Sequence, residues 1–242
     1  TDYVGHSFGP NSIEIEDTYL RLDKDIESFL NYLDKTVGKG NYTLFLSADH
    51  GVAHVPAFLK EHKIPAGTFD DADILKELNR KIEEKFAVKT AVKTVMNYQV
   101  YLNDKNIAEQ NKSKDEIIDF VIDRLKEKDF IINAFELDEV MEAALPAPQR
   151  EMMINGYNPK RSGDIEFTFK SGYFDGGTKG TTHGLWNPYD AHIPCVFFGW
   201  GVKPGKTNRE TYMTDIAPTL AALLKIQMPN GCVGKVITEL IK

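Results

Sequence analysis

Apolar residues recur at helical spacing in three long stretches of the chain. Between residues 13 and 37 the apolar positions repeat every three or four residues and form one stripe, made of Tyr19, Leu22, Ile26, Phe29, Leu30 and Leu33. The stretches 70–87 and 113–129 show the same periodicity. In the last of these, Ser113 followed three residues later by Glu116 is typical of a capped helix start. We therefore predict three amphipathic helices.

Two short apolar runs have the composition of strands instead. YTLFLSA (42–48) and IPCVFFG (193–199) are rich in strand-forming residues, and we predict that the first is a buried parallel strand. Cys195 in the second run is predicted to be a buried small apolar residue. The polar sequence DHG follows the first run at once. A polar cluster at the carboxyl end of a buried strand is typical of sites in open α/β sheets.

The middle of the chain has a different character. Runs such as AVKTVMNYQVYLN, FIINAFEL and DIEFTFK (164–170) predict strands, and DEVMEAAL predicts a short helix. We interpret 70–170 as a small α+β insertion into a core made of 1–69 and 171–242. The predicted fold class is α/β, with a mainly parallel sheet flanked by helices. Near the end, TDIAPTLAALLK (214–225) predicts one more helix, with Thr214 as its N-cap.

Composition excludes some classes of function. The chain has 242 residues, 42% of them hydrophobic and 27% charged, and a net charge of −7. An acidic chain is a poor general binder of nucleic acids or membrane surfaces, which attract basic proteins. No apolar stretch approaches the roughly 20 residues of a membrane span. The two cysteines fit no paired zinc-binding spacing.

Five carboxylate and imidazole side chains are candidates for metal chemistry: Asp2, His6, Asp49, His50 and His183. Each has an ordinary alternative, since Asp2 and His6 could be solvated polar residues, Asp49 a helix cap beside a surface His50, and His183 a structural histidine. Asp2 and His6 are four residues apart and would share one side of a helical turn. Together the five suit Zn²⁺ without thiolates. They are too many for one tetrahedral ion with an open position, so we expect two ions about 4 Å apart with some ligands missing. The other histidines are predicted to be structural or exposed, namely His54, His62 and His192.

The order of these motifs carries a family likeness. DYVGHSFGPNSIEIEDTYLRLD, SADHGVAHVP, GTTHGLWNPYDAHIPCVFFG and TDIAPTLAALL resemble the alkaline phosphatase superfamily. Within it, they resemble the periplasmic, phosphate-irrepressible alkaline phosphatases of flavobacterial type. The likeness runs across nearly the whole chain and is strongest in 1–58 and 172–225.

The resemblance implies roles for the five residues. One zinc ion would be held by Asp2, His6 and His183, and the second by Asp49 and His50. It also implies a threonine nucleophile and one more Asp ligand, both upstream of the DxxxH motif. Since the chain starts one residue before that motif and without Met, we expect a C-terminal part with no catalytic nucleophile of its own. The expected substrate is a small phosphate monoester, and the expected location is the periplasm or the medium.

Three alternatives remain open at this point. The parent protein could be a phosphodiesterase or nucleotide pyrophosphatase, or a sulfatase of the same superfamily. The chain could also be a non-catalytic metal-binding module. Nucleic-acid binding and a membrane span are not expected. An α/β sheet cut at this point would expose apolar surface, so we expect self-association.

Overall fold

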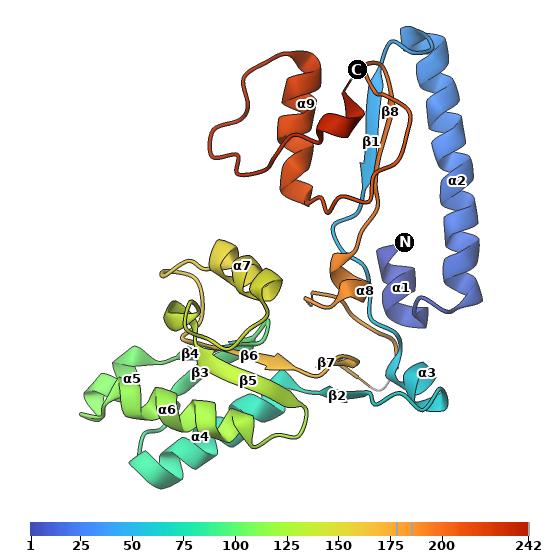
Figure 1. Ribbon diagram of the computed structural model, residues 1–242. Coiled ribbons are helices and arrows are strands. Elements are labelled where there is room, and N and C mark those ends of the chain that lie inside the picture. Colours follow the sequence, from blue (N-terminus) through green and yellow to red (C-terminus); the bar gives the residue numbers. More distant parts are fainter. Residues whose placement is uncertain (178, 185, 242) are drawn as a thin grey trace. The chain divides into compact units, whose positions relative to one another are not determined.

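A computed structural model describes residues 1–177, 179–184 and 186–241 (Figure 1). Two positions of the predicted loop 172–190 thus lie outside the described residues, Thr178 and Leu185. Among the described residues, no helix combines the length and the apolar character needed to cross a membrane.

The chain divides into two compact units, which are described separately. Unit 1 comprises residues 1–16 and 50–191, and unit 2 comprises residues 17–49 and 192–242. These boundaries differ from the predicted ones. The division into compact units does not test whether 70–170 is an insertion, so that assignment stays a prediction.

An antiparallel four-stranded sheet is the centre of unit 1. Its strand order is β3-β4-β6-β5, formed by Val92–Met96, Gln99–Leu102, Ile165–Phe169 and Ile131–Glu136. The strands predicted between 88 and 170 are thereby confirmed. All five residues of β6 are buried, so this strand is covered on both of its faces.

Helices α4 (Asp71–Phe86) and α6 (Lys114–Lys126) lie along one face of this sheet (Figure 1). Each begins at a side-chain cap, because Asp70 accepts a hydrogen bond from the Ala72 amide and Ser113 accepts one from the Glu116 amide. Two of the predicted amphipathic helices are confirmed, including the predicted N-cap at Ser113.

The remaining elements of unit 1 are short. They are α1 (Asp2–Phe8), α3 (Pro56–Glu61), β2 (Gly67–Phe69), α5 (Asp104–Glu109), a 3₁₀ turn (Leu137–Glu139), α7 (Ala147–Gly156), β7 (Tyr173–Asp175) and α8 (Pro188–Ala191). Strands β2 and β7 pair in parallel. Helix α7 lies on the opposite side of the four-stranded sheet from α4 and α6 (Figure 1).

The core of unit 1 is closed. Phe167 is fully buried, and Phe169 is 1% exposed among aromatic neighbours on the sheet. Leu78 of α4 and Leu125 of α6 are buried against the same sheet. A closed apolar core of this kind holds the loops of unit 1 in fixed positions.

Unit 2 contains most of α2 (Ile13–Leu33), which continues as a π-helical turn, Asp34–Gly38. It also contains β1 (Thr43–Ser47), β8 (Cys195–Gly199) and α9 (Ile216–Leu224). A 3₁₀ turn, Met213–Asp215, precedes α9, and another, Thr238–Leu240, lies near the end of the chain. The helix predicted at 13–37 is confirmed, whereas the predicted cap Thr214 lies inside the 3₁₀ turn.

The strand β1 corrects two predictions. It pairs with β8 in antiparallel register rather than parallel, and Phe45 is 44% exposed rather than buried. The predicted burial of Cys195 is also wrong, because this residue is exposed. An apolar run indicates a strand with buried side chains, but it does not show whether the partner strand runs parallel or antiparallel. Among the described residues β1 and β8 pair only with each other, and none of their residues is buried.

Candidate metal centre

Helix α1 places Asp2 and His6 one turn apart on the same face. Asp2 Oδ1 lies 3.5 Å from His6 Nε2, as the four-residue spacing predicted. Asp2 is in the first turn and His6 in the last, and a carboxylate in the first turn suits the helix dipole. After the helix, the Gly9 amide donates to the Gly5 carbonyl at 2.8 Å, and Gly9 has a φ of 81°. Glycine adopts this positive φ without strain, which lets the chain leave the helix.

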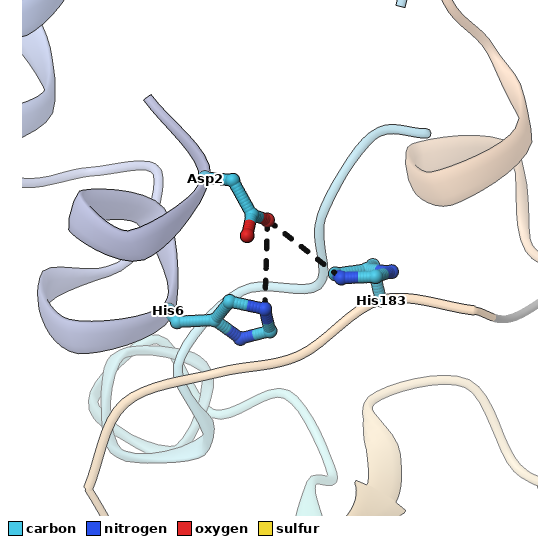
Figure 2. A group of neighbouring side chains, drawn as sticks. All are labelled: Asp2, His6 and His183. Carbon is cyan, nitrogen blue, oxygen red and sulfur yellow. Dashed lines mark ion pairs between the residues drawn. The ribbon is translucent and has the colours of Figure 1, made fainter. Parts of the chain in front are cut away.

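The loop that carries His183 is tied to the end of α1. The Thr181 amide donates to the His6 carbonyl at 2.9 Å, and His6 Nδ1 donates in return to the Thr181 carbonyl at 2.8 Å. A Cβ at Gly180 would lie 2.4 Å from the His6 carbonyl oxygen, and Gly180 has a φ of +78°. Only glycine fits this approach. The result is that His183 Nε2 lies 3.7 Å from Asp2 Oδ1 (Figure 2).

His50 reaches the same place from a third segment. Its Nε2 lies 3.8 Å from Asp2 Oδ1, and its ring stacks on that of His183 with centroids 3.3 Å apart and planes 6° apart. The Gly51 amide donates to the Asp190 carbonyl at 2.6 Å. Asp49 belongs to unit 2, so its place beside the other four candidates stays a prediction.

Thr181 supports the site and was not among the predicted residues. It is buried, and its hydroxyl donates to the Ala53 carbonyl at 2.6 Å. The Ala53 amide donates to the Thr182 carbonyl at 3.1 Å. The Thr181 hydroxyl is therefore committed to holding the loop rather than free to act as a nucleophile. The only sequence signal was the density of Gly and Thr in this loop.

The distances fit a metal ion. The possible ligand atoms of Asp2, His6 and His183 all lie within 4.8 Å of one another. Two ligands that are each about 2.05 Å from a tetrahedral zinc ion are roughly 3.3 Å apart, close to the 3.5 and 3.7 Å of the two Asp2–histidine distances. Because His6 Nδ1 donates its proton to a carbonyl, the lone pair of its Nε2 points to the site. Such outer hydrogen bonds orient metal-ligating histidines.

Electrostatics keep one of these histidines in its ligand form. Burial, followed by the neighbouring His50 and His6, lowers the pKa of His183. Asp2 and Asp190 act in the opposite direction but more weakly. His183 therefore stays neutral at neutral pH, and only a neutral imidazole can bind a cation.

Two further histidines of unit 1 make hydrogen bonds outside this cluster, in agreement with their predicted structural or exposed role. His54 Nδ1 forms a hydrogen bond with Asn11 Oδ1 at 2.6 Å, and His62 Nδ1 donates to the Phe58 carbonyl at 2.8 Å. Both contacts are exposed. His192, the remaining histidine outside the candidate set, belongs to unit 2.

Carboxylate and imidazole groups on an α/β scaffold thus form a candidate centre for a divalent metal ion. The pattern of the type I phosphodiesterase / nucleotide pyrophosphatase family matches residues 1–190. The chain belongs to this family.

Two curated relatives and one solved structure are similar to the whole chain. Alkaline phosphatase PafA of Elizabethkingia meningoseptica is 52% identical over 242 residues, which cover 100% of this chain and 44% of the relative. A protein of Myroides odoratus named calcium-transporting ATPase is 55% identical, again over 100% of this chain and 44% of the relative. The structure of wild-type PafA matches with a TM-score of 0.96 over 99% of this chain and 46% of that chain.

These matches confirm the predicted α/β fold class and the predicted superfamily. The predicted mainly parallel sheet is not found among the described residues, where only β2 and β7 pair in parallel. The chain spans less than half the length of the relatives that it matches. The activity of a whole protein therefore does not follow from the similarity alone.

Proposed function

We propose that this chain is the metal-binding part of a phosphoric monoester hydrolase of alkaline phosphatase type that uses two zinc ions. The observation that carries the proposal is the convergence of Asp2, His6 and His183 with metal-ligand spacing. The name of the 52% identical relative, alkaline phosphatase PafA, supports the reaction class.

In this proposal the five candidate residues divide between two ions. Asp2, His6 and His183 hold the first, and Asp49 with His50 holds the second. An ion bound by the first set supplies Lewis-acid stabilisation for the oxygen that leaves phosphorus. The chain's own part is to hold the imidazoles in place. His6 is fixed by the Thr181 carbonyl, and His50 Nδ1 donates to the Gly51 carbonyl at 2.8 Å.

The nucleophile is proposed to lie outside these 242 residues. It is expected to be a threonine, which would form a phospho-enzyme before water completes hydrolysis. Thr181 is the hydroxyl-bearing residue two positions from His183, and its hydroxyl is already bonded to Ala53. The described geometry of Thr181 therefore supports a structural role for it.

Zinc titration tests the metal-binding half of the proposal. His183→Ala is expected to lower the zinc affinity of the chain by at least about 100-fold, because loss of even an outer partner costs 10–100-fold. The matched control is His62→Ala, which removes an exposed histidine of the same unit. Equal zinc affinity of the two variants would refute the proposed ligand set.

Turnover tests the other half. The purified chain with saturating zinc should hydrolyse p-nitrophenyl phosphate no faster than zinc in buffer. Robust zinc-dependent hydrolysis that disappears in His183→Ala would show that these residues contain a complete catalytic site, and the proposed position of the nucleophile would be wrong.

A second candidate is a phosphodiesterase, and the description of the matching family favours it. The two candidates differ in the ester they prefer. In the complete enzyme, kcat/KM for p-nitrophenyl phosphate should exceed that for bis-p-nitrophenyl phosphate. The reverse order would select the diesterase, and activity on neither would favour a sulfatase or a non-catalytic module.

Location and self-association belong to the same proposal. We place the protein in the periplasm or the medium, where a phosphatase reaches esters that do not cross the membrane. Fractionation of the host cells tests this placement. We also propose that the chain self-associates through apolar side chains of unit 2, several of which are about half exposed, including Phe198 and Trp200.

A further inference from the structure

A cavity of about 250 Å³ lies within unit 1, next to the loop that carries His183. None of the candidate metal ligands lines it. Its walls come from α7, the turn between β3 and β4, β6, and the loop that holds Gly184 and Trp186. Gly184 directly follows His183. A cavity of about 150 Å³ already accommodates benzene, so this one has room for a single ring with a substituent.

Much of the lining is apolar or aromatic. Tyr98 and Trp186 meet edge to face with ring centroids 6.2 Å apart, and Tyr157, Met152 and Met153 complete this part of the wall. Aromatic rings and thioethers pack well against a flat unsaturated group.

Two buried polar groups face this apolar lining. Glu166 is 7% exposed, and its Oε2 accepts a hydrogen bond from Gln99 Nε2 at 2.8 Å. Gln99 is held in that orientation, because its own carbonyl oxygen accepts from the Gly163 amide at 2.8 Å and from the Tyr101 hydroxyl at 3.1 Å. None of the described residues bonds Glu166 Oε1. That oxygen is left as an acceptor for something else.

Gln149 is the second such group. It is 9% exposed, and its Nε2 has no hydrogen-bond partner among the described residues. A buried amide without a partner is costly, so a bound acceptor would repay part of this cost. The terminal torsion of glutamine is soft, and either end of the amide can turn toward a ligand.

Charge narrows the class of ligand. No lysine, arginine or histidine is among the described residues that line the cavity. An anion would therefore meet the Glu166 carboxyl without a compensating cation. Burial raises the pKa of Glu166 to about 7, against a smaller opposing effect of the Gln99 hydrogen bond, so about half of these carboxyls are charged at neutral pH and most are charged above it.

We propose that this cavity binds a small uncharged aromatic group that carries both a hydrogen-bond acceptor and a donor, as in a primary aromatic amide. The carbonyl of the amide accepts from Gln149, its N–H₂ group donates to Glu166, and its ring packs against Trp186. The site does not depend on the metal centre. Its position next to His183 would place the organic part of a ligand close to that centre.

The two tryptophans of the chain allow a direct test. Trp200→Phe leaves Trp186, at the cavity, as the sole tryptophan. In this variant, with EDTA present, benzamide should change the fluorescence saturably at millimolar concentrations. Benzoate, which has the same size but a negative charge, should bind at least tenfold more weakly. This comparison of two ligands does not require any change in the cavity itself.

Two cavity variants sharpen the test. Gln149→Met should weaken benzamide about fivefold, in line with the loss of one net hydrogen bond. Glu166→Gln keeps the side-chain shape, but its carbonyl oxygen must accept from Gln99 Nε2, so its N–H₂ group faces the ligand. Benzoate should therefore gain affinity relative to benzamide in this variant. Absence of any saturable benzamide signal, or benzoate binding as tightly as benzamide in the Trp200→Phe chain, would overturn the proposal and would leave the zinc titration unaffected.

Discussion

The two units of this chain use their apolar residues in different ways. In unit 1 the aromatic side chains Phe167 and Phe169 are buried between the sheet and its helices. In unit 2, Phe45 and Phe198 lie on paired strands and remain 44% and 49% exposed. The apolar runs of both units predict buried strands, but only unit 1 buries these side chains among its own residues. A closed core can hold a precise site, and the imidazole cluster is in unit 1.

The largest expected effect is on the stability of unit 1. Phe167→Ala should cost about 3–5 kcal/mol in the free energy of unfolding, because it leaves a cavity in a closed core. Phe198→Ala should cost only about 1 kcal/mol, since half of that side chain is already in water. Urea unfolding followed by Trp186 in a Trp200→Phe background reports on unit 1, and Trp200 in a Trp186→Phe background reports on unit 2. Similar costs in the two units would show that unit 2 buries its aromatic side chains as fully as unit 1 does.

The next effect depends on pH, through the buried carboxyl of unit 1. Glu166 has a raised pKa of about 7 when folded, against an ordinary value of 4.5, so the folded state holds its proton more tightly than the unfolded state does. The stabilisation is complete below about pH 4.5 and is lost as the pH rises through 7, with a total of roughly 3 kcal/mol.

Glu166→Gln should remove most of this loss between pH 5 and pH 8. Asp71, whose pKa is raised to about 6 by burial and by Asp175 and Asp70, contributes a loss of the same sign that the variant retains. Urea unfolding at the two pH values measures the difference. The control is Glu84→Gln, which changes an exposed glutamate of α4. An unchanged pH dependence in Glu166→Gln would mean that this carboxyl is not buried as described.

The smallest effect concerns association rather than folding. If the exposed apolar residues of unit 2 mediate self-association, Phe198→Glu should shift sedimentation toward the monomer by weakening apolar contact between copies. Ile132→Glu is the control, because Ile132 is 65% exposed but belongs to unit 1. A shift caused by Ile132→Glu and not by Phe198→Glu would show that unit 1 mediates the association, which would contradict the proposal.

The sequence predicted best those features that depend on neighbouring residues. The helix at 70–87 is α4, and Ser113 caps α6, because periodicity and capping are local properties. The shared face of Asp2 and His6 follows from a four-residue spacing. These signals need no knowledge of the rest of the chain.

Features that depend on distant partners were not predictable in the same way. The antiparallel pairing of β1 with β8 joins residues about 150 positions apart, and an apolar run carries no direction. The roles of Gly180 and Thr181 depend on contacts with α1 and Ala53. The position of Glu166 between apolar residues of β6 is a weak sequence signal of a special role. Its neighbour across the cavity, Gln149, belongs to a different element, so the pair could not be predicted from sequence.

X-ray absorption at the zinc edge, with one equivalent of zinc on the chain, is the most direct test of the proposed zinc ligands. We predict a first shell of nitrogen and oxygen at about 2.0–2.2 Å with imidazole scattering, and a smaller imidazole contribution in His183→Ala. The chain also contains two free cysteines in unit 2. A sulfur shell at about 2.3 Å, or an imidazole contribution unchanged by loss of His183, would show that zinc binds elsewhere and would contradict the assignment of this site.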